Sequence, residues 1–283
     1  MSIKLIADST CDISDELIRE HNIRIVPLSV SAGGKFLKDG VEITSEDIFR
    51  YVESGEGMCR TSAVNVDEYL KVYAEESPKH DAILHFTISA DMSSCYQNAR
   101  IAAEDFDNIF IIDTRNLSSA MGHLVLDAAE LAASGMSPEG IYREITKRID
   151  LLDASFLLDT LTYLHKGGRC SSIAALASSV LKIKPCIVVD NGAMSVGQKY
   201  RGKLESVMLK YIDDRLSQKD NIDPRRIIIA HTFAEENLGL VDVVKAHIAT
   251  IMPFDQVYVA TAGGTISCHC GPNTLGLFLV RRG

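Results

Sequence analysis

Short apolar runs alternate with helical segments through the first half of the chain. The runs that predict strands are residues 4–7, 23–30, 82–88 and 109–112. Helices are predicted after Ser14 and at residues 44–53, 66–76, 93–104, 117–133 and 138–149. Strands and helices that alternate in this way predict βαβ units around a mostly parallel sheet with flanking helices.

The pattern changes near residue 152. Strands are predicted at residues 186–189, 195–200, 227–230, 256–260 and 275–280, and helices at 161–165, 172–182, 203–216 and 235–249. Asn191-Gly192 separates the first two of these strands and is a strong signal for a β-hairpin turn. The fold class is therefore α/β. A chain of 283 residues also favours two domains, which we place at residues 1–151 and 152–283.

Several element boundaries carry signals of their own. Ser14, Thr44 and Ser137 are predicted N-caps, and Thr44 has an acidic residue in the capping-box position. Gly33-Gly34 predicts a hairpin turn that leads into residues 35–39. Gly167-Gly168 predicts a helix end.

Composition excludes some functions. Hydrophobic residues make up 46% of the sequence and charged residues 24%, and the net charge is −9. An acidic chain argues against nonspecific binding to nucleic acid or anionic membrane. No apolar run approaches the roughly 18 residues of a membrane-spanning helix, so no stable membrane insertion is expected. Seven cysteines without a secretory signal predict free thiols in the cytoplasm.

Polar residues follow several predicted strands, where α/β folds bind ligands. The segments are Asp8-Ser9-Thr10, Arg60-Thr61-Ser62, Ser93-Ser94 and Asp113-Thr114. Helix N-termini nearby offer free N–H groups and the positive end of a dipole, so these turns favour an anion. Each turn can equally be an ordinary helix cap, and the sequence leaves both interpretations open.

Glycine-rich segments match phosphate loops poorly. Gly167-Gly168-Arg169 lacks the GxxxxGK[ST] spacing and a preceding strand, so we interpret it as a helix C-cap. Gly263-Gly264-Thr265 and Gly271-Pro272 are interpreted as turns. No cofactor is expected.

Cys268-His269-Cys270 suggests a metal site if the segment is a strand, because residues two apart on a strand share a face. A structural zinc site usually shows two paired ligand motifs, and the sequence has no second one, so we expect no metal. Without a GxSxG nucleophile elbow, no catalytic residue is indicated either. His85 and His231 lie on predicted strands and are expected to be packing residues.

Taken in order, these turns resemble the motifs of the DegV family, the bacterial fatty-acid-binding proteins that serve a fatty acid kinase. Residues 8–12 resemble the family's opening D-S-T-x-D, and Thr61-Ser62 stands where the family has T-S. Residues 88–99, ISADMSSCYQNA, are similar to I-S-S-x-L-S-G-T-Y-Q-x-A. Further similar segments are VPL at 26–28, Asp39-Gly40, residues 113–122, YLHKGGR at 163–169, IKP at 183–185 and HCGP at 269–272. The resemblance spans nearly the whole chain.

The resemblance implies a two-domain DegV-like (EDD-type) α/β fold with the ligand between the domains. It implies that Thr61, Ser62 and Ser93 bind the carboxylate of a long-chain fatty acid, with His269 and Arg169 nearby. The protein would not be an enzyme. It would present the fatty acid to a separate fatty acid kinase and carry the acyl phosphate, which an acyltransferase of phospholipid synthesis would then use.

The acyl chain would enter a tunnel with aliphatic walls, since aromatic residues are 6% of the sequence and Trp is absent. The same side chains can also be plain core. The tunnel candidates are Phe156, Leu158, Leu161, Ile173, Leu176, Val180 and Leu181.

Four positions depart from the family pattern. Ser94, Ala120 and Asn273 replace glycines, and Cys95 replaces a threonine. Side-chain atoms added near a ligand predict a narrower entrance or a different preferred acyl chain.

Two basic residues predict a docking surface. Arg201 and Lys203 follow the predicted hairpin on an otherwise acidic chain, so we expect them to dock the kinase. They can equally be a solvated helix start.

The alternative function is an α/β transferase or hydrolase that acts on a small anionic substrate at the same polar turns after the predicted strands. A scaffold that binds no ligand remains open as a third function.

Overall fold

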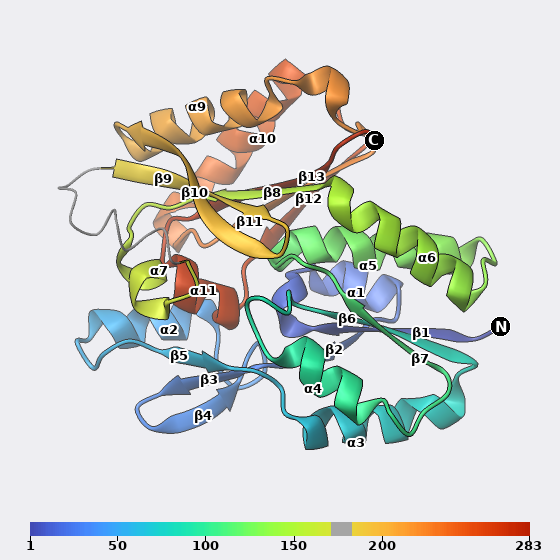
Figure 1. Cartoon of the computed structure of the whole chain (residues 1–283). Coiled ribbons are helices and arrows are strands. Elements are labelled where there is room, and N and C mark those ends of the chain that lie inside the picture. The colour runs from blue at the N-terminus through green and yellow to red at the C-terminus, as the bar shows by residue number, and fades with distance from the viewer. Residues whose placement is uncertain (171–182) are drawn as a thin grey trace.

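The computed structural model describes residues 1–170 and 183–283. These residues form three β-sheets with helices packed on and between them (Figure 1). The predicted helix at 172–182 lies outside the described residues, as do the tunnel candidates Ile173, Leu176, Val180 and Leu181. No helix within the described ranges is long and apolar enough to cross a bilayer.

The N-terminal half contains the expected parallel sheet. Its two central strands are buried along almost their whole length, which explains why their sequences are nearly continuous apolar runs. Every neighbouring pair is parallel. In spatial order the strands are β2 (Arg24–Val26), β1 (Ile3–Asp8), β6 (Ala82–Thr87) and β7 (Ile109–Asp113).

A small antiparallel sheet departs from the sequence prediction. The single strand predicted at 23–30 is wrong: the chain forms β2 and then, after Pro27, β3 (Ser29–Ala32) in a different sheet. Proline has no N–H for a ladder hydrogen bond, so the break falls there. β3 pairs with β4 (Lys35–Lys38) through the expected hairpin turn. It also pairs with β5 (Arg60–Ser62), a segment predicted as a turn.

The C-terminal half contains a six-stranded mixed sheet. Its β11–β12 pair is parallel, and its other pairs are antiparallel. The predicted hairpin at Asn191-Gly192 is confirmed, with positive φ angles of 50° and 89° at the turn. In spatial order the strands are β10 (Ala193–Arg201), β9 (Ile183–Asp190), β8 (Leu152–Leu157), β13 (Leu275–Val280), β11 (Arg226–His231) and β12 (Gln256–Thr261).

The helices begin mostly where the sequence predicts. Ser14, Thr44 and Ser137 accept the expected N-cap hydrogen bonds, and the Thr44–Asp47 capping box is complete. The α-helices are α1 (Asp15–Glu20), α2 (Ser45–Glu53), α3 (Val66–Glu76), α4 (Cys95–Ala102), α5 (Ser118–Ala133), α6 (Pro138–Arg148), α7 (Thr162–Gly167), α9 (Leu204–Leu216), α10 (Gly239–Ile251) and α11 (Gly264–Cys270).

Helix α5 joins the two halves. It is apolar around most of its circumference and contacts strands of both the parallel and the six-stranded sheet. In Figure 1, α5 and α6 lie between these sheets, α9 and α10 cover the far face of the six-stranded sheet, and α3 and α4 cover the far face of the parallel sheet. One hydrophobic cluster combines Leu5 and Leu124 with Ala154 and Phe278, and so crosses the predicted boundary at residue 151.

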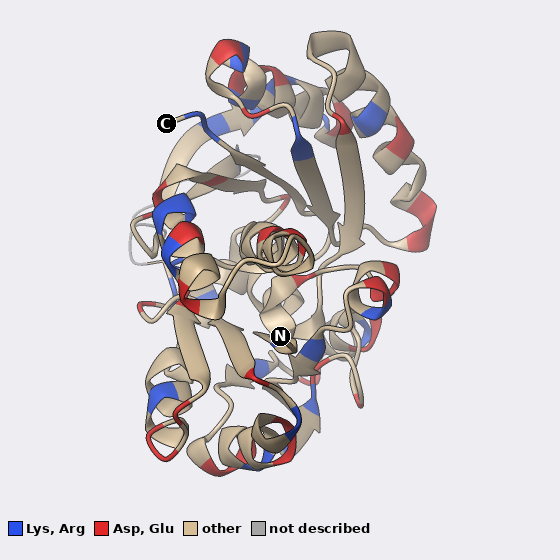
Figure 2. Cartoon of the chain, turned by 90° about the vertical axis from the view of Figure 1, so that its right-hand side faces the viewer, with Lys and Arg blue, Asp and Glu red and all other residues tan. Residues whose placement is uncertain are grey.

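Charged residues lie mainly on the outer helices. In the view of Figure 2, acidic and basic positions are intermixed on these helices. Some charged residues are buried, and one of them is Asp127 of α5, which pairs with Arg148, Arg225 and Arg226.

Candidate functional site

A cavity opens between the parallel and the six-stranded sheets. The empty space within it is about 800 Å³, including the open space at its mouth. The apolar part of its wall consists of Leu28, Ala63, Ile88, Met92, Leu117, Phe156, Leu164, Met194, Ala230, Ala262, Ile266 and Phe278. The wall is therefore mainly aliphatic.

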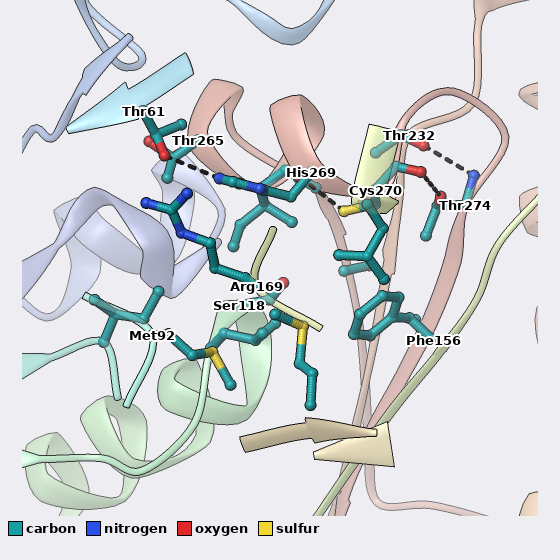
Figure 3. A pocket seen from close by; sticks show the side chains of 18 of the residues that line it. Thr61, Met92, Ser118, Phe156, Arg169, Thr232, Thr265, His269, Cys270 and Thr274 are labelled. Carbon is teal, nitrogen blue, oxygen red and sulfur yellow. Dashed lines mark hydrogen bonds between the residues drawn. The ribbon is translucent and has the colours of Figure 1, made fainter. Parts of the chain in front are cut away.

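One end of this cavity carries the polar side chains that were predicted to bind a carboxylate. All five residues predicted to bind a carboxylate line it: Thr61, Ser62, Ser93, Arg169 and His269. Thr61 Oγ1 lies 2.9 Å from His269 Nε2, although 208 residues separate them. In Figure 3 the side chains of Thr61, Arg169 and His269 converge, and Phe156 lies on the other side of the cavity.

His269 is a neutral imidazole. Burial, together with the nearby positive charge of Arg169, lowers the pKa of His269 to about 4. Its Nδ1 is buried and has no hydrogen-bond partner among the described residues. The backbone of α7 lies close to this atom, because a Cβ on Gly167 would be only 2.3 Å from Nδ1.

Ser93 and Arg169 reach the cavity from helix ends. The N–H of Cys95 donates to Ser93 Oγ at 3.3 Å, so Ser93 also supports the start of α4. Arg169 follows the predicted C-cap at Gly168, whose positive φ of 69° confirms that interpretation. The guanidinium of Arg169 is exposed and donates to the carbonyl of Gly167 at 2.7 Å, which places the charge at the cavity mouth.

Helix α11, which carries His269, was not predicted from the sequence. Residues 268–270 are helical, and Gly263-Gly264-Thr265, which was interpreted as a turn, is the helix start. Two buried carboxylates hold that start. Asp39 accepts the N–H groups of Gly264 (2.7 Å) and Thr265 (3.1 Å), and Asp12 accepts that of Gly263 (2.8 Å).

The helical conformation also removes the basis for a shared metal site at Cys268 and Cys270. Side chains two apart on a helix point in different directions. Cys268 packs in a hydrophobic cluster with Cys59, whereas Cys270 lines the cavity and donates to the carbonyl of Ile266 at 2.8 Å.

Of the described residues that were predicted to form the tunnel, one lines the cavity and two do not. Phe156 forms part of the wall. Leu158 and Leu161 belong to the hydrophobic cluster that includes Phe156 but do not line the cavity.

Arg201 and Lys203, predicted to dock a partner, are exposed at the end of β10 and the start of α9.

Comparisons with known proteins show which family the chain belongs to. A sequence profile described as "Uncharacterised protein, DegV family" matches residues 2–282. The chain belongs to the DegV family. A DegV domain-containing protein of Caldanaerobacter subterraneus is 30% identical over 280 residues, covering 98% of both chains.

Solved structures of family members have the same fold. The fatty-acid-binding DegV family protein of Thermus thermophilus superimposes with a TM-score of 0.91 at 27% identity, covering 99% of this chain and 100% of that one. A stearic-acid-binding protein of Eubacterium ventriosum superimposes with a TM-score of 0.84 at 27% identity, covering 99% and 98%. The predicted α/β fold of the DegV type is confirmed.

Sequence reasoning missed several cavity residues of this DegV family member. Ile88, Thr232 and Ala262 directly follow the last residues of β6, β11 and β12. The rule that α/β folds bind ligands at the carboxyl ends of strands applies to apolar as well as polar residues there, and would have found them. Thr265 and Thr274 carry no comparable signal.

The two strand histidines differ. His85 is fully buried and bonded to Tyr73 and Asp8, as a packing residue should be. His231 instead lines the cavity. Its Nδ1 accepts the N–H of Phe233 at 3.2 Å, and burial lowers its pKa, so it is a second neutral imidazole in the wall.

Proposed function

We propose that this chain binds a long-chain fatty acid, with the carboxylate at the polar end of the cavity and the acyl chain between the two sheets. The observation that carries the proposal is the presence of hydroxyl, guanidinium and imidazole groups at one end of a mainly apolar cavity. The fatty-acid-binding proteins of T. thermophilus and E. ventriosum, similar over 99% of this chain, support it.

Thr61, Ser62 and Ser93 supply neutral donors for the carboxylate. The neutral ring of His269 carries one proton, and Nε2 is within hydrogen-bond distance of Thr61. With that proton on Nε2, the ring donates to Thr61 Oγ1 and leaves the threonine hydroxyl free to donate to the ligand. This tautomer also leaves the buried, unpartnered Nδ1 without a proton, and so leaves no unpaired donor there.

Arg169 supplies a positive charge at the mouth of the cavity. Because the guanidinium is exposed, it attracts a carboxylate without enclosing it. The oxygen atoms of the head group therefore stay close to the protein surface, within reach of a second protein.

The acyl chain supplies most of the affinity. Burial of each CH₂ stabilises a complex by about 0.8 kcal/mol, so a long chain contributes more than any one head-group hydrogen bond. We infer that the aliphatic wall determines how tightly the ligand binds, and that the polar end determines its orientation.

Under this proposal the chain presents the ligand rather than reacting with it. Cys270 lines the cavity, but burial raises the pKa of its thiol, and a neutral thiol is a poor nucleophile. A cytoplasmic fatty acid kinase would phosphorylate the carboxylate at the mouth, and an acyltransferase would use the acyl phosphate. The alternative of an α/β transferase or hydrolase has no such observation in its favour.

Mass spectrometry of an organic extract of the native protein tests the proposal. We expect a bound fatty acid, and a melting temperature that rises on adding stearate but rises much less on adding its methyl ester, which lacks the charged head group. Absence of lipid together with no stearate-induced rise would overturn the proposal. A rise with small anions but not with stearate would favour the transferase or hydrolase.

A further inference from the structure

Two buried cysteines meet beside the polar end of the cavity. Cys59 and Cys268 are not joined by a disulfide. Cys59 and Cys268 belong to one small hydrophobic cluster with Val30 and Ile48, and the two thiols interact with each other. The two residues come from parts of the chain that are 209 positions apart in sequence (268 − 59).

The elements that carry this pair also carry the head-group residues. Cys59 directly precedes β5 and lies two positions before Thr61, and Cys268 directly precedes His269 on α11. Thr61 faces α11, because its hydroxyl is 2.9 Å from His269. Alternate residues of an extended segment share a face, which accounts for the contact of Cys59 with the same helix.

The two sulfurs differ in reactivity. The hydrogen bond from Cys268 lowers the pKa of Cys59, so Cys59 has more thiolate character than an ordinary cysteine. It is also slightly the more exposed, at 7% against 3% for Cys268. Burial raises the pKa values of the remaining cysteines for which a shift is resolved, namely Cys11, Cys95, Cys186 and Cys270.

We propose that Cys59 and Cys268 are a peroxide-sensitive thiol pair whose disulfide ties β5 to α11. The Cys59 thiolate attacks one oxygen of hydrogen peroxide, the O–O bond breaks, and a sulfenic acid and water form. Cys268 then attacks the sulfenic sulfur, the S–S bond forms, and a second water leaves. One peroxide gains two electrons and both thiols are oxidised, so two thiols and one peroxide give one disulfide and two waters.

The disulfide acts on the site through distance. The bond joins the segment before β5 to α11 and fixes the separation of these two elements. The Thr61–His269 contact lies between these same elements. Loss of one hydrogen bond to a charged group corresponds to a roughly tenfold weaker affinity, which is the decrease we expect for stearate. This effect on affinity rests on the proposed function, whereas formation of the disulfide does not.

Titration of the reduced full-length protein with hydrogen peroxide tests the pair. We expect peptide mapping to show a Cys59–Cys268 disulfide at the lowest peroxide doses, and dithiothreitol to reverse it. In Cys268→Ala, peroxide should leave Cys59 as a sulfenic acid that dimedone traps. Cys186→Ala, which removes a thiol from a different hydrophobic cluster, is the matched control and should form the disulfide normally.

The mapping needs no variant, so the proposal stays testable even if a substitution impairs folding. If other cysteines are oxidised before Cys59 and Cys268 link, the proposal is overturned. If the disulfide forms but stearate binds the oxidised and reduced proteins equally, the effect on the site is overturned. If the reduced protein does not bind stearate at all, the proposed function fails while the disulfide stands on the mapping.

Discussion

Asp12 is a buried carboxyl group that stabilises the site without touching the ligand cavity. It accepts the N–H of Gly263 at the start of α11 and the hydroxyl of Ser118 at the start of α5. Burial, with a smaller contribution from the neighbouring Asp39, raises the pKa of Asp12 to about 7 despite these hydrogen bonds. Its protonation state therefore changes within the physiological range.

The raised pKa of Asp12 predicts that the free energy of unfolding falls as pH rises. The pKa is about 7 in the folded protein and 3.8 in the unfolded chain, so between these values only the folded state holds the proton. The free energy of unfolding should therefore decrease between about pH 4 and pH 7. In Asp12→Asn the amide can accept from Gly263 and donate to Ser118 without ionising.

We expect Asp12→Asn to be more stable than the wild type at pH 8, on the order of 1–2 kcal/mol, and less pH-dependent. Urea unfolding between pH 5 and pH 8 measures both. Asp105→Asn, at an exposed position, is the control and should leave the curve unchanged. A variant that is less stable at pH 8 would show that the ionised carboxylate is favourable there.

Ser93→Ala tests the head-group assignment at a single hydroxyl. Loss of one hydrogen bond to a carboxylate costs about 1.5–3 kcal/mol, a tenfold or greater loss of affinity. Titration calorimetry with decanoate is the suitable measurement, because a shorter acyl chain gives weaker binding that is easier to measure. Ser94→Ala removes the same group from the exposed neighbouring position and should bind normally. Equal affinities for both variants would remove Ser93 from the site.

At the scale of elements, a helix start can be predicted when its capping residues are close in sequence. It cannot be predicted when the capping residues are far away in sequence. The Thr44–Asp47 capping box lies within four consecutive residues, and the sequence alone identifies it. Helix α11 is different, because the carboxylates that hold its start come from Asp12 and Asp39, 251 and 225 residues earlier. Nothing in the sequence near residue 264 indicates those partners, so Gly263-Gly264-Thr265 was interpreted as a turn and the helix was missed.

The candidate site divides in the same way. The residues at its polar end were predictable because the family motifs contain them. His231 was assigned to packing because a lone histidine on a strand gives no sign of which face meets a cavity. Leu158 and Leu161 were assigned to the wall because apolar residues in core and in cavity walls look alike in sequence.

Gly167→Ala tests the contact between α7 and α11. A Cβ at this position would lie 2.3 Å from His269 Nδ1, so the imidazole or the helix must move. We expect a tenfold or greater loss of stearate affinity and a loss of stability of about 1–3 kcal/mol, even though alanine favours helices. Gly239→Ala is the control, because a Cβ there meets open space. Stearate binding that equals the wild type would show that this contact does not position His269.

At the scale of the molecule, the ligand cavity and the expected docking segment lie on different parts of the structure. The cavity is between the sheets, whereas Arg201 ends β10, at the edge of the six-stranded sheet, and Lys203 is the N-cap residue of α9. Within the part of the chain that the structure describes, neither side chain forms an ion pair. A cation at a helix N-terminus is mildly unfavourable, which argues for a use other than stability.

Basic residues at a sheet edge have a second explanation, because they discourage pairing with other chains. The two explanations predict different effects of Arg201→Ala. If Arg201 docks a fatty acid kinase, the variant should bind stearate normally, while kcat/KM for acyl-phosphate formation falls about tenfold at low salt and depends less on salt. If Arg201 protects the edge, turnover stays normal and the variant aggregates more readily.

Lys245→Ala is the matched control for this test, since it removes one exposed charge from the outer helix α10 instead. Measurements at several salt concentrations separate a docking effect from the general change in net charge, because Lys245→Ala changes the net charge equally. We expect Arg201→Ala to lower the salt dependence and Lys245→Ala to leave it unchanged. Equal behaviour of the two variants would place the docking surface elsewhere on the molecule.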